Sequence, residues 1–414
     1  MAPESPIDAP PRQLVRGTSE GPPDGVASQE RLAIRRLGLL WLCGLDLRIT
    51  ILAIPPLLPQ IRQSLGLSET ELAALTTLPV LLMAVVAPLG SAATSRVGPR
   101  RTAMAALAVV AVASALRGAG GGAAGLFLLT AVMGAAIATT QPALPALVRH
   151  WLPGRAGLAT ATYVNGMLVG ESVAASLTLA LAGLTGAWQA ALAAWSVPVA
   201  LAAILLAGRG RSTAEGAEDT RWLPDWRSRR TWELGLLQGA AAVAYFAANT
   251  FLPIYLHARG SQLVVASLIA LNVCQLPASL AAAALPTRHA TGATAVAGLG
   301  LLIAAAVGLI LAGSAPTVIL GAGLTGFATS WTYLIAVTLP ALGASPTEAA
   351  RVSAGMFSIG YTMAFALPVL GGAASDLAGT AAAGFLPGLL SSCIMLALVP
   401  AFRGRQRAQR SVGN

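Results

Sequence analysis

The sequence predicts an all-α membrane protein with twelve transmembrane helices in two pseudo-symmetric six-helix bundles. Of the 414 residues, 56% are hydrophobic and only 10% are charged, against about 45–50% and about 25% in an ordinary soluble domain. The apolar residues form runs of about 20 or more, the length at which a helix crosses about 30 Å of hydrocarbon. Composition and run length together exclude a soluble globular enzyme.

Twelve apolar runs follow one another, separated by Gly, Pro and charge clusters. They predict spans at 36–58, 70–94, 102–119, 123–148, 157–183, 187–207, 232–257, 262–285, 291–312, 315–340, 350–373 and 380–402. The amino-terminal residues cannot bury enough apolar surface to become ordered. The predicted organisation is a disordered cytoplasmic tail at 1–35, a bundle at 36–207, a cytoplasmic linker at 208–231, a second bundle at 232–402 and a basic cytoplasmic tail at 403–414.

The basic residues predict the orientation of the chain. All 26 are Arg. If the termini are cytoplasmic, the inside segments hold 22 of them and the outside loops hold only Arg62, Arg117 and Arg259, which leaves Arg48 within the membrane. Short inside loops carry an excess of basic residues, so we expect a multi-pass protein of the cell (inner) membrane with both termini cytoplasmic. No basic stripe is interleaved with aromatic residues, so nucleic acid is not an expected partner.

The two halves of the chain resemble each other. Leu58-Pro59 and Leu252-Pro253 close the first span of each half, and Gly66 and Gly260 follow at the same offset of 194 positions. A weak match at a constant offset is what a duplicated six-helix unit leaves behind. A chance match in Ala- and Gly-rich sequence is the alternative.

No catalytic or metal-binding pattern accompanies the spans. His150, His257 and His289 lie near span ends without metal-ligand spacing, and no nucleophile or phosphate-binding motif is present. The three cysteines lie far apart inside apolar runs, without a C-x-x-C pair. The sequence therefore predicts no enzyme, no catalytic residue, no metal site and no cofactor.

Two six-helix halves joined by a central polar loop resemble the major facilitator superfamily. The loop after the second span is similar to the superfamily's loop motif, which helps control closure on the cytoplasmic side. Ser95 stands where that motif has Asp, so the usual charge relay lacks its acid, and the Arg cluster is left to cap helix ends or bind lipid headgroups. The gate residues implied by this resemblance are Gly90, Arg96, Gly98, Arg100 and Arg101.

Shorter motifs narrow the resemblance to the cyanate transporter and 2-nitroimidazole transporter family. They are Asp46-Leu-Arg48-Ile-Thr50, Pro56-Leu-Leu-Pro59-Gln-Ile, Leu75-Thr-Thr-Leu-Pro79, Leu144-Pro145-Ala-Leu-Val148 with Arg155 and Tyr163, and Ser353-Ala-Gly355-Met-Phe-Ser-Ile-Gly360-Tyr361 with Pro368, Gly371 and Asp376. The chain departs from the family at Asp46 and Ile49, where Asn and Pro are usual. The resemblance implies a secondary active transporter that works by alternating access.

Two charged residues near the middle of spans are the main site candidates. Arg48 lies too far from either end of its span to reach water easily, and a buried charge usually faces a wet cavity or a partner. We expect its planar guanidinium to bind an anionic or strongly dipolar substrate; a structural ion pair is the alternative. Glu171 is interpreted as a proton carrier or a static partner of Arg48. Asp46 is the other coupling or ion-pair candidate; it cannot share a helix face with Arg48 and is expected to contact another span or the cytoplasmic half of the cavity.

Gln141, Asn249 and Tyr361 are the remaining substrate-binding candidates, although each could instead join two helices. The predicted function is secondary active transport of a small anionic or polar solute, with proton coupling as an option. The predicted partners are that solute and the lipid bilayer, and the chain is expected to be a monomer. A non-transporting membrane sensor or receptor, or a multidrug-type exporter, is the alternative.

Overall fold

The computed structural model describes residues 24–119, 121–208, 225–284, 291–341 and 345–412. Within these ranges the regular structure is helical, and no strand occurs. Eleven helical segments of the described chain are long and apolar enough to cross a membrane, and the shorter apolar segment Val264–Ala278 lies eighth in chain order. The fold class predicted from the sequence is therefore confirmed.

The amino-terminal half contains long helices together with shorter and broken elements. Its helices are α1 (Asp24–Leu52), α2 (Leu58–Leu65), α3 (Glu69–Val97), α4 (Pro99–Leu116), α5 (Gly122–Trp151), α6 (Ala156–Thr185), α7 (Trp188–Ala194) and α8 (Ser196–Ala207). The expected span at 187–207 is thus divided at Trp195, where α7 gives way to α8.

The carboxy-terminal half repeats this pattern. Its helices are α9 (Arg229–Ala258), α10 (Val264–Val273), α11 (Gln275–Ala284), α13 (Ala293–Ala312), α14 (Ala315–Thr338), α15 (Pro346–Ala378) and α16 (Leu386–Val412). The expected span at 262–285 is divided at Cys274, between α10 and α11.

The ends of the chain differ from the prediction. Helix α1 begins at Asp24, so residues 24–35 are helical, and the prediction that this part of the tail is disordered was wrong. Ala, Gln, Glu, Leu and Arg in this stretch favour helix, and they extend α1 beyond the apolar run. Helix α16 likewise continues to Val412. The rest of the predicted tail, 1–23, and most of the predicted linker, 209–224, lie outside the described residues.

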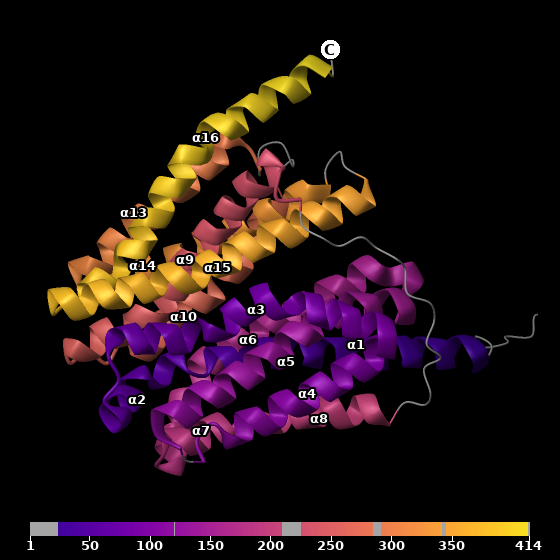
Figure 1. Ribbon diagram of the computed structural model, residues 1–414, viewed down its shortest axis with the longest axis horizontal. Helices are drawn as coiled ribbons and strands as arrows, with labels where there is room; N and C mark the ends of the chain where they lie inside the picture. Colours follow the sequence, from indigo (N-terminus) through magenta and orange to yellow (C-terminus); the bar gives the residue numbers. More distant parts are fainter. Residues whose placement is uncertain (1–23, 120, 209–224, 285–290, 342–344, 413–414) are drawn as a thin grey trace, which may run out of the picture.

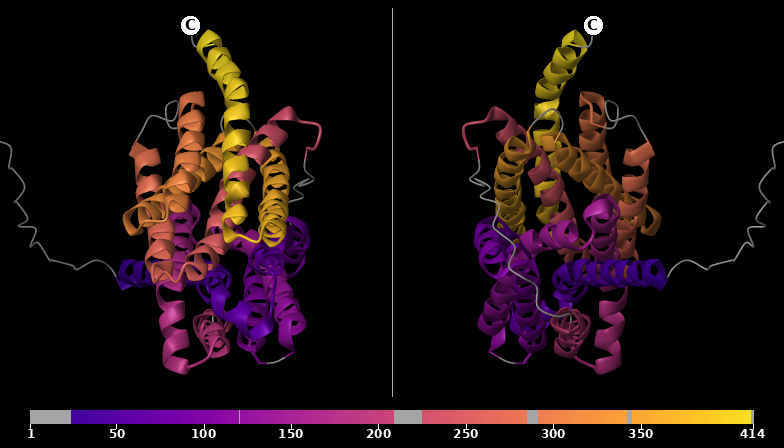
Figure 2. Two further views of the ribbon diagram at one scale, coloured as in Figure 1. Left: turned by 90° about the vertical axis from the view of Figure 1, so that its left-hand side faces the viewer. Right: turned by 90° about the vertical axis from the view of Figure 1, so that its right-hand side faces the viewer.

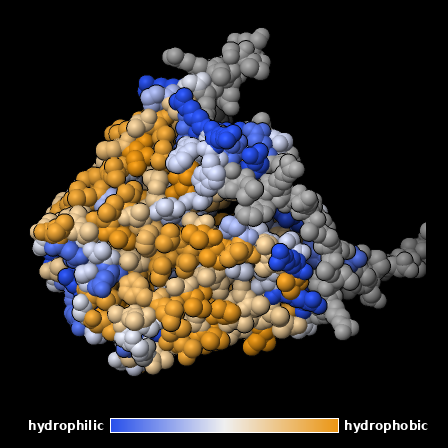
Figure 3. Space-filling model, viewed as in Figure 1, coloured by the Kyte–Doolittle hydropathy of each residue, from blue (hydrophilic) through white to orange (hydrophobic). Residues whose placement is uncertain are grey.

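The two halves meet at one end of the molecule and diverge toward the other (Figures 1 and 2). We call the end near α2 the closed face and the end where α1 begins and α16 finishes the terminal face. Apolar residues cover most of the side of the molecule seen in Figure 3, as a surface in contact with lipid requires.

Glycines bring α1 and α6 into backbone contact in the amino-terminal half. A Cβ at Gly166 would overlap the carbonyl oxygen of Trp41, and one at Gly170 would lie 2.5 Å from that of Leu45. Small residues four positions apart allow such close approach between membrane helices. The contact sets Arg48, less than one turn after Leu45, at the level of Glu171, which follows Gly170.

The internal repeat is visible in equivalent hydrogen bonds. Arg36 Nη1 donates to the carbonyl oxygen of Trp151, at the end of α5, over 2.8 Å. Arg230 Nη2 donates to the carbonyl oxygen of Leu339, at the end of α14, over 2.6 Å. Arg36 and Arg230 are 194 positions apart, the offset found in the sequence. Each Arg satisfies a carbonyl group that the end of a helix leaves free.

Candidate substrate cavity

A cavity of about 320 Å³ lies between the two halves. On each lining helix it extends from near the level of Arg48 toward the terminal face, where the halves diverge. Its lining residues come from seven long helices, α1, α3, α5, α6, α9, α14 and α15, and from α11; they are Leu47, Arg48, Val80, Met83, Gln141, Leu144, Tyr163, Val164, Met167, Leu168, Glu171, Gln238, Ala241, Ala242, Tyr245, Phe246, Gln275, Thr329, Ser330, Tyr333, Leu334, Phe357 and Tyr361.

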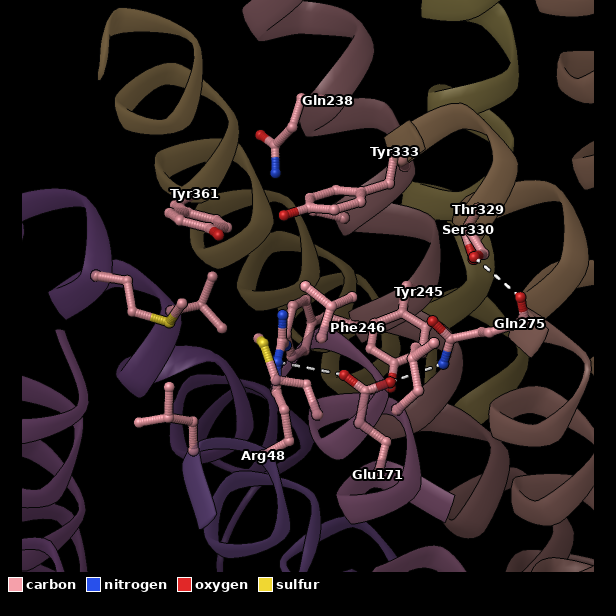
Figure 4. A pocket seen from close by; sticks show the side chains of 18 of the residues that line it. Arg48, Glu171, Gln238, Tyr245, Phe246, Gln275, Thr329, Ser330, Tyr333 and Tyr361 are labelled. Carbon is pink, nitrogen blue, oxygen red and sulfur yellow. Dashed lines mark hydrogen bonds and ion pairs between the residues drawn. The ribbon is translucent and has the colours of Figure 1, made fainter. Parts of the chain in front are cut away.

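A charge pair in this cavity is bonded to both halves of the protein (Figure 4). Arg48 Nε lies 3.3 Å from Glu171 Oε1, and the two side chains are 14% and 5% exposed. The other carboxylate oxygen, Oε2, lies 2.9 Å from the Tyr245 hydroxyl and 2.7 Å from Gln275 Nε2. Arg48 and Glu171 belong to the amino-terminal half, whereas Tyr245 and Gln275 belong to the other half, so Glu171 joins the two.

The break between α10 and α11 places two amide side chains beside this pair. The Tyr245 hydroxyl lies 2.6 Å from Asn272 Oδ1 as well as 2.9 Å from Glu171. Asn272 Nδ2 donates to the carbonyl oxygen of Leu268 over 2.8 Å, which keeps Oδ1 turned toward Tyr245. Gln275, on the other side of the break, lies 3.4 Å from the same Oδ1. The polar network is therefore continuous from Arg48 to Asn272.

Aromatic rings line the cavity on the side of the carboxy-terminal half. Phe357 and Tyr361 stack with ring centroids 5.4 Å apart and an interplanar angle of 26°. Tyr333 lies 6.5 Å from Phe357 with its ring tilted by 46°. Flat rings of this kind offer apolar faces and hydroxyl groups at one site, which suits a planar solute that has polar edges.

Gln238 is a buried polar residue in the lining without a hydrogen-bond partner. It is 0% exposed, and within the described chain neither amide atom of its side chain has a partner. The amide lies near Tyr333 and Tyr361 in Figure 4. A Cβ at position 360 would overlap the Gln238 Oε1 atom, so Gly360 leaves the space in which the amide sits. An unpaired buried amide calls for an explanation, and a bound solute is one.

The structure brings four of the predicted site residues together and leaves two outside. Arg48, Glu171, Gln141 and Tyr361 all line the cavity, and the expected proximity of Arg48 to Glu171 is present. Asn249 is buried outside the lining, where its amide donates to the carbonyl oxygen of Tyr245 over 3.1 Å. The binding roles of these residues stay predictions.

The depth of Asn249 and the helix face of Asp46 explain why these two residues lie outside the cavity lining. Asn249 follows Ala242, which lines the cavity, by seven positions, so it shares that helix face but lies about 10 Å nearer the closed face. Asp46 lies two positions from Arg48, on another side of α1, and is not among the lining residues. Asp46 is 0% exposed, and neither of its carboxyl oxygens has a hydrogen-bond partner among the described residues.

The predicted gate loop is bonded within its own half. Arg100 donates through Nε and Nη2 to the carbonyl oxygen of Leu206, at 2.9 and 2.6 Å, so it caps the end of α8 as the basic cluster was expected to do. Gly98 joins α3 to α4 with a φ of +91°, and Gly90 packs against α5, where a Cβ would lie 2.7 Å from Thr139 Cα. Arg96 and Arg101 are exposed. A gating role for this loop stays a prediction.

Tyr245 and Gln238 were missed by the sequence reasoning, although the internal repeat could have indicated them. Arg48 corresponds to Ala242 at the offset of 194, and both line the cavity. Tyr245 and Gln238 lie three and four positions from Ala242, on the same face of α9. Within the described ranges, no group of three or more His, Cys, Asp or Glu side chains could hold a metal ion.

Comparison with known proteins decides the family. The profile of the Major Facilitator Superfamily matches residues 40–401, which is most of the chain. The chain belongs to this superfamily. It is 28% identical to the 2-nitroimidazole transporter of Escherichia coli (strain K12) over 327 residues, covering 77% of this chain and 82% of that one. The family and this relative indicate a membrane transporter for a small molecule.

Two further relatives match shorter segments. The chain is 28% identical to the cyanate transport protein CynX of Escherichia coli (strain K12) over 236 residues, covering 56% of this chain and 62% of that one. It is 29% identical to the uncharacterized transporter YycB of Bacillus subtilis (strain 168) over 219 residues, covering 52% of this chain and 54% of that one. The match to YycB thus spans about half the length of that relative.

Solved structures share the fold at low sequence identity. The nucleoside transporter NupG has a TM-score of 0.73 at 12% identity, covering 89% of this chain and 99% of that one. A bacterial homologue of the human lysosomal transporter Spinster has a TM-score of 0.72 at 16% identity, covering 91% and 97%. At these identities the likeness supports the fold alone.

Proposed function

We propose that this transporter is a secondary active carrier that moves a small polar or anionic solute through the central cavity by alternating access, with both termini cytoplasmic. The observation that carries the proposal is the Arg48–Glu171 pair, which is held in the cavity by groups from both halves. A change at this pair alters contacts between the halves, and rocking of one half against the other around a central site is how such carriers work.

The charges of the lining favour joint binding of an anion and a proton. Arg48 and Glu171 are the two charged residues among the described lining residues, and they neutralise each other. An anion can take the full guanidinium of Arg48 only if Glu171 releases it. Protonation of Glu171 removes the competing charge, so binding of one anion and one proton leaves the net charge of the cavity unchanged.

The hydrogen bonds around Glu171 suit both of its protonation states. The Tyr245 hydroxyl has one proton and two acceptors within reach, Glu171 Oε2 and Asn272 Oδ1. When Glu171 is ionised, Tyr245 and Gln275 both donate to it. When Glu171 is protonated, it can donate to the Tyr245 oxygen while Tyr245 donates to Asn272. Neither state leaves the carboxyl group without a partner, which favours a proton-carrying role.

The remaining lining favours a small planar solute. The stacked rings of Phe357 and Tyr361 offer flat apolar faces, and the unpaired amide of Gln238 offers one donor and one acceptor group. Two of the relatives are named for 2-nitroimidazole, a small planar heterocycle, and for cyanate, a small linear anion. These names support the choice of test solutes.

The test is uptake into proteoliposomes that contain the purified full-length protein, with and without an imposed pH gradient. Cyanate, other small anions and 2-nitroimidazole are the solutes, and an internal pH dye reports proton movement. We expect solute uptake that depends on the gradient in the wild type and loses this dependence in Glu171→Gln. Glu348→Gln removes an exposed carboxylate far from the cavity and serves as the control.

Failure of every solute to enter or to exchange would reject the proposed carrier function for these compounds. Uptake that is independent of pH and accompanied by net charge movement would reject proton coupling through Glu171. A loss of gradient dependence in Glu348→Gln as large as that in Glu171→Gln would show that the effect does not come from the cavity.

A further inference from the structure

The closed face is held by a carboxylate of one half and the start of a helix in the other. Asp376, near the end of α15, accepts a hydrogen bond at Oδ1 from the backbone N–H of Glu69 over 2.9 Å. Its Oδ2 accepts one from the backbone N–H of Thr70 over 2.9 Å and another from the Thr70 hydroxyl. Since α15 and α3 belong to different halves, these bonds join the two bundles directly.

The first turn of a helix is a favourable place for this carboxylate. Its N–H groups lack partners within the helix, and the helix dipole places partial positive charge there. Hydrogen bonds to an ionised carboxylate are stronger than those between neutral groups. The hydrogen bonds to the start of α3 therefore stabilise the ionised side chain of Asp376 at its present position. These bonds break when the two halves separate.

Helix α3 does not need Asp376 as its own cap. Ser68 Oγ accepts from the backbone N–H of Glu71 over 3.2 Å, and Glu71 Oε2 accepts from the backbone N–H of Ser68 over 2.8 Å. This reciprocal pair is a complete capping box within the amino-terminal half. The bonds from Asp376 are additional, and what they add is a link between the halves.

Close backbone packing supports the same contact. A Cβ at Gly372, one turn before Asp376, would lie 2.6 Å from the carbonyl oxygen of Glu69 and 2.7 Å from Thr70 Cα. Only a residue without a side chain allows α15 to approach α3 so closely. A second polar contact on this face joins Gln63 Nε2 of α2 to His257 Nε2 of α9 over 2.9 Å.

The matching positions elsewhere lack such a carboxylate. At the offset of 194, Asp376 corresponds to Ala182 at the end of α6. On the terminal face, Ser95 stands where the superfamily's loop motif has an acid, and its hydroxyl donates to the carbonyl oxygen of Ala92 in its own helix over 3.0 Å. Ala182 lies on the closed face like Asp376, so the neutral Ser95 is the one of these two positions at which a carboxylate could stabilise the opposite arrangement of the halves.

We propose that Asp376, seated on the start of α3 beside Gly372, is a latch that keeps the closed face shut and biases the transporter toward the conformation open at the terminal face. Opening of the cavity to the other side requires these bonds to break. The proposal rests on the proposed function only in that opening and closing are steps of transport, because the latch itself is a property of the two bundles.

The test measures distances between spin labels on the full-length protein in lipid nanodiscs. Cysteines at Thr185 and Ser314 report on the closed face, and cysteines at Arg101 and Ala350 report on the terminal face. The three native cysteines are replaced by Ser. All four label positions are exposed.

The latch variants are Asp376→Asn, which keeps the size of the side chain, and Gly372→Ala. The matched control is Glu71→Gln, which neutralises a carboxylate at the same helix start that is bonded within its own half. We expect a short distance across the closed face in the wild type. Each latch variant should raise the ratio of open to shut molecules at that face about tenfold or more, with the opposite change at the terminal face.

Four results would overturn the latch. They are a wild type that is mainly open at the closed face, latch variants with unchanged distances at both faces, an equal response in Glu71→Gln, and a widened closed face without narrowing of the terminal face. The two latch variants are read independently, so misfolding of one leaves the other as the test. Absence of solute uptake would refute the proposed function and would leave these distances as informative as before.

Discussion

Removal of Glu171 should destabilise the protein more than removal of Arg48, and removal of both should restore stability. Glu171→Gln leaves the guanidinium of Arg48 without a counter-charge at a side chain that is 14% exposed. Breaking a buried pair from one side costs about 3–5 kcal/mol, and the partial contact of Arg48 with the cavity places the cost near about 3 kcal/mol. Arg48→Gln leaves Glu171 with Tyr245 and Gln275 as hydrogen-bond donors. We therefore expect this variant to lose only about 1–2 kcal/mol of unfolding free energy.

The double variant has no unpaired charge and should lose about 1 kcal/mol or less, which corresponds to a coupling free energy of about 3–5 kcal/mol. The assay is thermal unfolding in nanodiscs, followed by tryptophan fluorescence at one pH and salt concentration. If each bundle unfolds as a unit, about 3 kcal/mol lowers the melting temperature by about 6–12 °C. Transport should not recover in the double variant, because the anion site is gone.

An ion pair with one exposed partner provides the control cycle. Arg229 Nε lies 2.7 Å from Glu233 Oε1, closer than the cavity pair, but the Arg229 side chain is 84% exposed and that of Glu233 is 12% exposed. Exposed pairs one helical turn apart contribute about 0.3–0.5 kcal/mol, so its coupling should be small. Additive losses at Arg48 and Glu171, within about 0.5 kcal/mol, would refute the reasoning and would show that the two residues stabilise the fold separately.

Three further predictions concern the anion site, the unpaired amide and the topology. Arg48→Lys keeps the charge but loses the planar fork, so uptake should fall about tenfold or more while the protein still inserts; near-normal uptake would reduce Arg48 to a point charge. Gln238→Leu should weaken uptake while the free energy of unfolding stays equal or rises by about 1–2 kcal/mol, since a buried unpaired amide is removed. A lower melting temperature would show that Gln238 has a structural role. A cysteine at Gln262 should react with an impermeant thiol reagent on intact cells and one at Ser95 should not; the reverse pattern would refute the orientation.

The positions of the spans were predictable because each depends on a local property of the chain. About 20 consecutive apolar residues are enough to specify a crossing, whatever the rest of the chain does. The same local reasoning indicated that Arg48 and Glu171 lie within spans and must find water or a partner. It was less reliable at the ends of helices, where α1 begins at Asp24 because residues outside the membrane also favour helix.

The sequence by itself determined the membrane class, the number and order of spans, the duplicated halves and the two intramembrane charges, because these depend on local hydropathy and on a constant offset. Only the tertiary structure decided which polar residues share the cavity and which close it. Tyr245 meets Glu171 across 74 positions, and Asp376 meets Glu69 across 307. Such contacts depend on the depth of each helix and on how one bundle rests against the other. A one-dimensional pattern does not contain these quantities. For this reason the structure places Gln238 and Tyr245 in the cavity lining, which the sequence did not predict, and places Asn249 outside it.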